Sequence, residues 1–82
     1  MAKILVSEAD PDVRRLLIVL VRRLGHEAVV LDPGGAVPPR ADLLLAEPGT
    51  DVLELPVIST TKPFTVAQMR SRIVHSLSAS LA

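Results

Sequence analysis

The stretch "AKILVSEADPDVRRLLIVLVRRLGHEAVVL", residues 2–31, predicts the fold class. Its two ends, AKILVS (residues 2–7) and HEAVVL (residues 26–31), are short, largely apolar runs. Such runs are typical of strands that are buried on both faces. Between them, residues 11–24 carry apolar side chains at helical spacing. A strand, a helix and a second strand in this order favour an α/β fold with a mainly parallel sheet.

Helix start and stop signals frame this first predicted helix. Asp10 is a good N-cap residue, and Pro11 suits the first helical position because proline needs no hydrogen-bond partner there. Gly25 is a typical residue just after a helix end. The predicted core stripe of the helix consists of Val13, Leu16, Leu17, Leu20 and Leu24.

The rest of the chain adds two strands and one helix. ADLLLA (residues 41–46) and LPVIST (residues 55–60) are predicted strands, whereas the prolines and glycines of residues 32–40 predict a loop. Residues 65–81 are predicted to form an amphipathic helix with Thr65 as its N-cap. The apolar positions of that helix are Val66, Met69, Ile73, Leu77 and Leu81.

Composition limits the possible functions. The 82 residues are enough for one small domain, residues 1–82, with an aliphatic core, since 49% are hydrophobic and one is aromatic. Nine basic and nine acidic residues cancel, which gives no electrostatic case for nucleic acid or for an anionic membrane. The absence of cysteine excludes disulfides and thiolate chemistry. No apolar run is long enough to span a membrane and the first residues are not a signal peptide, so a cytoplasmic protein is expected.

Acids, hydroxyls and one lysine follow the predicted strands. In open parallel sheets, functional groups gather at the carboxyl ends of the strands. The side chains there are Glu8, Asp10, Glu47, Thr60, Thr61 and Lys62. Other interpretations stay open: Glu8 and Asp10 can simply favour the helix N-terminus, and Glu47 can pair with Lys62 or be exposed.

Three stretches together resemble the receiver domain of bacterial response regulators. They are "KILVSEADPDVRRLL" (residues 3–17), "LGHEAVVLD" (residues 24–32) and "TKPFTVAQMRSRI" (residues 61–73), with "ADLLLAEPG" and "LPVIST" as weaker support. The resemblance implies a truncated flavodoxin-like fold of about four mainly parallel strands in the order 2-1-3-4. Its two helices would cover one face of the sheet. The middle three helices of a receiver, and one of its strands, have no room in this chain.

The resemblance also implies a degenerate phosphorylation site. Receivers transfer a phosphoryl group to an aspartate after the third strand, beside a divalent metal that is held by two acids after the first strand. By position, Glu8 matches the first of those acids, Ala9 replaces the second, and Glu47 replaces the phosphoacceptor. Mg²⁺ binding is therefore expected to be weak or absent, and no cofactor is expected, with Glu8 and Glu47 as weak metal candidates.

The hydroxyl and the lysine of the family can also be assigned by position. Thr61, or Thr60, matches the hydroxyl residue, and Lys62 matches the lysine. Receivers commonly have a cis bond between this lysine and the next proline, which predicts a cis Lys62–Pro63 bond. No catalytic residue is predicted.

The leading hypothesis is a non-enzymatic, degenerate receiver that acts as an interaction module. The alternative is a phosphoacceptor in two-component signalling with a rebuilt acid site of Glu8, Asp10 and Glu47. A third interpretation is a minimal fold with no signalling role.

Two surfaces are predicted to bind partners. The strands are apolar on both faces, so the face without helices should be buried in a homodimer, with Leu44 and Val57 as candidate contacts. Ile18 and Val19 lie between arginines on the first helix and form a second candidate surface for a partner. A histidine kinase or another signalling protein is a candidate partner of the module as a whole.

Overall fold

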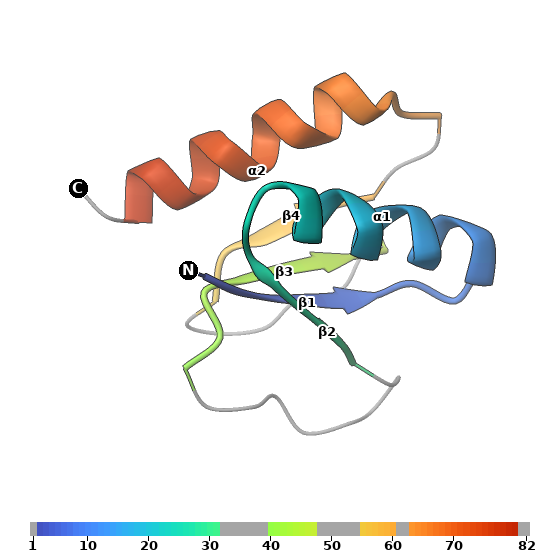
Figure 1. Cartoon of the computed structure of the whole chain (residues 1–82), viewed down its shortest axis with the longest axis horizontal. Helices are drawn as coiled ribbons and strands as arrows, with labels where there is room; N and C mark the ends of the chain where they lie inside the picture. Colours follow the sequence, from blue (N-terminus) through green and yellow to red (C-terminus); the bar gives the residue numbers. More distant parts are fainter. Residues whose placement is uncertain (1, 32–39, 48–54, 61–62, 81–82) are drawn as a thin grey trace.

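The structure is a computed structural model, which describes residues 2–31, 40–47, 55–60 and 63–80. Its elements are β1 (Lys3–Ser7), α1 (Pro11–Arg23), β2 (Glu27–Val30), β3 (Leu43–Ala46), β4 (Val57–Ser59) and α2 (Val66–Ser80). The four strands form one sheet in the order β2-β1-β3-β4, and every neighbouring pair is parallel (Figure 1). The predicted α/β class and the strand order 2-1-3-4 are thus confirmed, including the fourth strand.

The start of α1 is capped as predicted. Oδ1 of Asp10 accepts hydrogen bonds from the backbone N–H groups of Asp12 at 2.9 Å and Val13 at 3.4 Å. Pro11 is the first helical residue, where it sacrifices no hydrogen bond. These local interactions direct the chain from the carboxyl end of β1 into the helix.

The end of α1 is a Schellman motif. The N–H of Gly25 donates to the carbonyl of Arg22 at 3.0 Å, and the N–H of His26 donates to the carbonyl of Val21 at 3.2 Å. Gly25 has φ 86°, a left-handed conformation that side chains disfavour. A Cβ on Gly25 would meet no atom within 4 Å, so backbone conformation rather than space selects glycine here.

A capping box starts α2. The N–H of Gln68 donates to Oγ1 of Thr65, and the N–H of Thr65 donates to Oε1 of Gln68, each at 3.1 Å. Thr65 is therefore the N-cap that the sequence predicts. The reciprocal bond from Gln68 is an addition that the helical pattern alone did not reveal.

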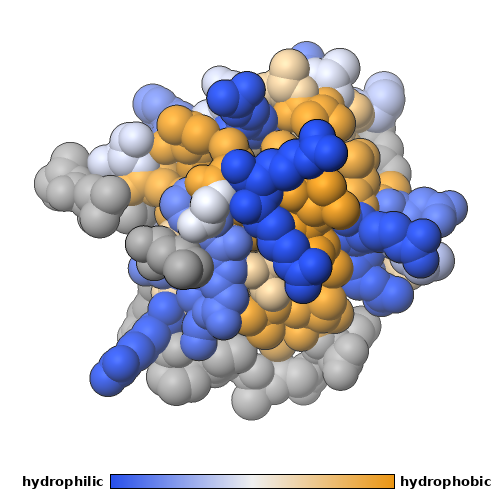
Figure 2. Space-filling model, in the orientation of Figure 1, coloured by the Kyte–Doolittle hydropathy of each residue, from blue (hydrophilic) through white to orange (hydrophobic). Residues whose placement is uncertain are grey.

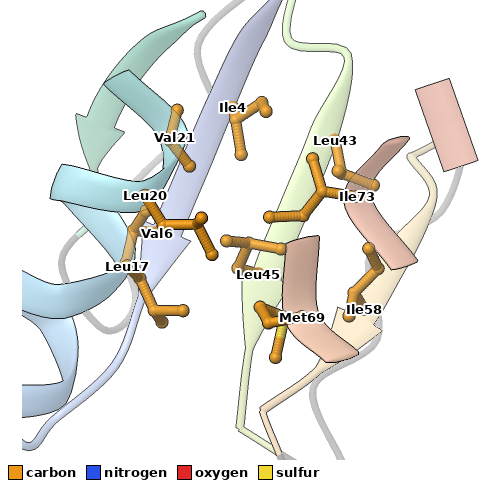
Figure 3. Close-up of a cluster of buried hydrophobic side chains, with 10 residues drawn as sticks. All are labelled: Ile4, Val6, Leu17, Leu20, Val21, Leu43, Leu45, Ile58, Met69 and Ile73. Carbon is orange, nitrogen blue, oxygen red and sulfur yellow. The ribbon is translucent and has the colours of Figure 1, made fainter. Parts of the chain in front are cut away.

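Both helices pack on one face of the sheet and build the larger core (Figure 3). Alternate strand residues point to this helix side, as the two-residue period of a strand requires. The buried residues of this core are Ile4, Val6, Leu17, Leu20, Val21, Leu43, Leu45, Ile58, Met69 and Ile73.

The other face of the sheet carries no helix among the described residues. Leu5, Leu44 and Ala46 form a smaller buried cluster there, and none of them has exposed surface. Half-buried apolar residues pack against this cluster: Val29, Leu31, Ala41, Leu55 and Val57. In the described part of the chain the expected face without helices, called the helix-free face below, is therefore present, but its central residues Leu5, Leu44 and Ala46 have no exposed surface.

The rotation of the helices about their axes differs in detail from the prediction. Leu16 and Val66, both assigned to core stripes, are 41% and 46% exposed. Val21, which the predicted stripe omits, is fully buried. Ile18, predicted to be an outward residue, is half-buried and packs against the larger core.

Several predictions concern residues outside the described part of the chain. They are the loop predicted over residues 32–40, of which the structure describes only Arg40, the roles of Thr61 and Lys62, the cis Lys62–Pro63 bond and the core position of Leu81. The parallel pairing of β3 with β4 is described, although the ten residues 47–56 are all that separate the two strands. This separation falls somewhat short of the usual length of a parallel crossover.

Candidate functional site: an acid pocket at the carboxyl edge of the sheet

Strand alternation explains why Glu8, Glu47 and Thr60 meet. Each follows a helix-side residue of its own strand by two positions; these helix-side residues are Val6, Leu45 and Ile58. Because the strands are parallel, their carboxyl ends lie at the same edge of the sheet. The three polar side chains therefore close the helix-side core at that edge.

Glu8 and Thr60 form the buried part of this acid pocket. Their exposed fractions are 5% and 2%, and Oγ1 of Thr60 donates to Oε2 of Glu8 at 2.9 Å. Oε1 of Glu8 also accepts from the N–H of Asp10 at 3.2 Å. The backbone holds Thr60 in place, because its N–H donates to the carbonyl of Ala46 at 2.8 Å. A buried carboxylate requires such partners, since desolvation without them is costly.

The hydroxyl of Thr60 has a choice of acceptors. The carbonyl of Ala46 lies 3.2 Å from Oγ1, which is longer than the 2.9 Å to Glu8. A hydroxyl has one hydrogen, so it cannot donate fully to both acceptors. The shorter contact to the carboxylate is the charge-assisted one and is favoured when Glu8 is ionised.

Glu47 forms the exposed part of the pocket. Its Oε1 accepts a hydrogen bond from the N–H of Ala9 at 3.1 Å, across 38 positions of sequence. This bond joins the end of β3 to the segment between β1 and α1. The carboxylate of Glu47 thus lies beside the backbone that follows the end of β1.

The chain's own carboxylates use the backbone donors around the start of α1. Four N–H groups donate to Glu8, Asp10 or Glu47: those of Ala9, Asp10, Asp12 and Val13. A helix N-terminus with free N–H groups is a common binding place for anions. Here three internal carboxylates occupy these donors. Among the described residues no buried side-chain nitrogen or oxygen lacks a hydrogen-bond partner.

The predicted site residues are thus partly brought together. Glu8, Asp10 and Glu47 lie around the start of α1, and Thr60 is the threonine that contacts Glu8. Thr61 and Lys62 lie outside the described residues. Within the described ranges, no three His, Cys, Asp or Glu side chains form a group suited to a metal ion. Ala9 contributes only its backbone to the pocket, whereas a carboxylate there would add a metal ligand.

Comparisons with protein-family models, with curated proteins and with solved structures found no match to this chain. None of the helices in the described part of the chain is both long and apolar enough to cross a membrane.

Proposed function

We propose that the chain is a shortened, degenerate receiver-like module of flavodoxin-like topology that binds partners and does not catalyse a reaction. The observation that carries this proposal is the state of the acid pocket. The carboxylate of Glu47 accepts a hydrogen bond from the N–H of Ala9. The buried carboxylate of Glu8 accepts hydrogen bonds from the hydroxyl of Thr60 and from the N–H of Asp10. Such a module would act in cytoplasmic signalling.

The pocket chemistry disfavours phosphoryl transfer. Transfer requires close alignment of the attacking oxygen with the phosphorus and with a bound metal. Glutamate at position 47 carries its carboxylate one methylene further from the backbone than aspartate does. Alanine at position 9 removes a metal ligand. Both changes oppose the alignment of the attacking oxygen with the phosphorus and the metal. The negative charge of Glu47 would also take the place of the charge that phosphorylation adds.

A homodimer through the helix-free face is the assembly that we propose with this function. Its support is the ring of half-buried apolar residues around Leu44, of which Val57 lies on the edge strand β4. Leu44 itself has no exposed surface in the single chain, so the dimer contacts would come from that ring. A signalling protein such as a histidine kinase is a further possible partner of the module.

Phosphorylation with a small phosphodonor tests the proposal. The purified chain is incubated with acetyl phosphate and Mg²⁺, and its intact mass is measured by mass spectrometry. We expect no phosphoryl adduct on the wild-type chain. The double variant Ala9→Asp, Glu47→Asp should gain an acid-stable, base-labile adduct, because it restores the acid pair and the shorter acceptor.

Two comparisons make this test specific. Ala9→Asp alone should improve Mg²⁺ binding without producing an adduct, since Glu47 keeps the wrong length. An adduct on the wild-type chain that disappears in Glu47→Gln would refute the proposal. That result would instead favour a phosphoacceptor with a rebuilt acid site of Glu8, Asp10 and Glu47.

A further inference from the structure

The amino edge of the sheet, opposite the acid pocket, is held by side chains as well as by backbone. The N–H of Ala2 donates to Nδ1 of His26 at 3.1 Å, and the N–H of Lys3 donates to Oδ2 of Asp42 at 2.8 Å. Consecutive N–H groups of a central strand point toward its two neighbours, so these bonds tie the start of β1 to the segments before β2 and β3. Two titratable side chains therefore act as acceptors at this edge.

His26 joins the end of α1 to the starts of β1 and β2. Its N–H donates to the carbonyl of Val21 in the last turns of α1, and its ring accepts from Ala2. The carbonyl of Ala2 accepts in turn from the N–H of Glu27 at 2.9 Å. The pairing of Lys3 with Glu27, continued by one residue, places Ala2 opposite His26. The imidazole is half-buried at this junction.

The bond from Ala2 defines the chemical form of the imidazole. A ring nitrogen that accepts a hydrogen bond carries no hydrogen, so the ring of His26 is neutral and its hydrogen is on Nε2. Protonation would add a hydrogen to Nδ1. Two N–H groups would then face each other across 3.1 Å, and neither can accept a hydrogen bond. The bond therefore exists only while the ring is neutral.

We propose that His26 is a pH-operated latch on the start of β1. Near neutral pH the imidazole accepts the N–H of Ala2. In mildly acidic solution the imidazolium turns away from that N–H, and on the β2 side Ala2 keeps the backbone bond from Glu27. Histidine suits this role because it ordinarily changes charge at about pH 6.5, close to the pH of most solutions in which proteins work.

Asp42 makes the release one-sided. Its carboxylate accepts the N–H of Lys3, and its own N–H donates to the carbonyl of Lys3 at 2.8 Å. Aspartate is ordinarily ionised throughout the range in which histidine titrates, so this acceptor keeps its charge while His26 changes. Mild acid should thus loosen the start of β1 toward β2 and leave its attachment on the β3 side in place.

Charges of both signs surround the latch. The charged residues on the elements that meet at this edge are Arg22 and Arg23 of α1, Lys3 of β1, Glu27 of β2 and Asp42 before β3. Figure 2 shows long hydrophilic side chains on the surface in the region of α1. The cations oppose a charge on the ring, whereas the acids and the carbonyl end of α1 favour it. Because these influences have opposite signs, the state of the Ala2 N–H reports the latch more directly than overall stability does.

Amide hydrogen exchange, followed by NMR on the full isotope-labelled chain, tests the proposal. Rates are measured at about pH 7.5 and about pH 5, on either side of the usual histidine range, and compared with the intrinsic rate at each pH. Protection of the Ala2 amide should fall about fivefold at the lower pH, the size expected for the net contribution of one hydrogen bond. Protection of the Lys3 amide should change by less than about twofold, because its acceptor is Asp42.

Matched variants assign the effect to Nδ1 of His26. In His26→Asn the side-chain oxygen lies as many bonds from the backbone as Nδ1 does, so it can accept from Ala2 but does not titrate. Protection of Ala2 should then persist at both pH values. His26→Ala should leave Ala2 equally unprotected at both. His75→Asn, the same change at the exposed histidine of α2, should keep the wild-type response. Circular dichroism checks that each variant remains folded.

Three results would overturn the latch. The first is equal protection of the wild-type Ala2 amide at the two pH values. The second is an equal loss at Ala2 and Lys3 in acid, which would show a general loosening of the chain. The third is the same pH response in His26→Asn as in the wild type, which would assign the effect to another group. The latch and the acid pocket lie at opposite edges of the sheet, so neither result bears on the phosphorylation test.

Discussion

The two faces of the sheet are built from the same four strands but are buried in different ways. On the helix side, ten buried residues pack together. They come from three strands (β1, β3 and β4) and from both helices, which lie far apart in the sequence. On the other face, three buried residues come from β1 and β3 alone, surrounded by apolar residues that keep part of their surface. Adjacent residues of β3 thus enter two unlike environments.

This difference separates what holds the fold together from what the fold offers to partners. The helix side is closed by α1 and α2 and ends in the polar contacts of Glu8 and Thr60. The helix-free face presents apolar area at its rim, where added contacts could be made. We therefore expect substitutions on the helix side to change folding, and substitutions at the rim of the other face to change assembly.

Leu45 and Leu44 give the largest expected contrast. Both are fully buried neighbours on β3, but Leu45 packs under the helices and Leu44 belongs to the small cluster. Leu45→Ala should lower the free energy of unfolding by about 4 kcal/mol, because the helices cannot collapse into the cavity. Leu44→Ala should cost about 2 kcal/mol, near the low end for such changes. Urea unfolding measures both values.

The same two variants can also give results that contradict the expected difference between the two faces of the sheet. If Leu44→Ala costs as much as Leu45→Ala at every protein concentration, the two faces are equally well packed within one chain. A loss for Leu44→Ala that shrinks as the protein is diluted would instead link this face to the dimer, because dilution removes the stabilisation that dimerisation gives to the wild type.

A substitution of Val57 tests the proposed homodimer. It lies half-buried on the helix-free face and on the edge strand β4. We expect the wild-type chain to be a dimer at micromolar concentration, burying about 1,600 Å² in total. Val57→Glu should shift sedimentation to the monomer, because a charge would have to be desolvated in the interface. Val74→Glu, on the 46% exposed outer side of α2, is the matched control and should stay dimeric.

A wild-type chain that sediments as a stable monomer at these concentrations would contradict the dimer directly. The same holds if Val57→Glu and Val74→Glu behave alike, since the interface would then not involve the helix-free face.

Periodicity predicted the elements of the fold better than it predicted their orientation. The spacing of leucines identifies α1, and Asp10 and Gly25 frame it, because these signals are local. Leu16 also fits that spacing, yet it is exposed while Val21 is buried. The contact of α1 with β1 and β2 determines which flank faces the core, and this tertiary constraint is not encoded in the spacing.

The acid pocket, too, could be predicted from the sequence only in part. The residues at the strand ends could be identified from sequence, because parallel strands bring their carboxyl ends to one edge. The choice between Thr60 and Thr61 could not be made, since it depends on where the pairing of β4 with β3 ends. The N–H of Thr60 donates to the carbonyl of Ala46, which fixes this register. The bond from Ala9 to Glu47 joins distant segments and has no local sequence signal.

Substitutions of Thr60 test the hydrogen bond between Thr60 and Glu8 at the edge of the helix-side core. Thr60→Val keeps the shape of the side chain but removes the hydroxyl that donates to the buried carboxylate of Glu8. The loss should be about 1–3 kcal/mol, because a buried acceptor loses a partner. Thr60→Ser keeps the hydroxyl and should cost less. Equal unfolding free energies for Thr60→Val and the wild type would show that the contact with Glu8 contributes nothing to stability.

Glu47 should give the smallest effect on stability, because its side chain is exposed and its bond to the N–H of Ala9 competes with water. Glu47→Gln keeps an oxygen acceptor for that N–H and removes the charge, whereas Glu47→Ala removes both. If the hydrogen bond is what matters, Glu47→Gln should match the wild type and Glu47→Ala should lose less than about 1 kcal/mol in urea unfolding. If charge is what matters, both variants should lose the same amount, and the loss should shrink at high salt because screening weakens exposed charges. The first outcome supports a carboxylate that fills the pocket as a hydrogen-bond acceptor; the second indicates that its negative charge is the property the pocket requires.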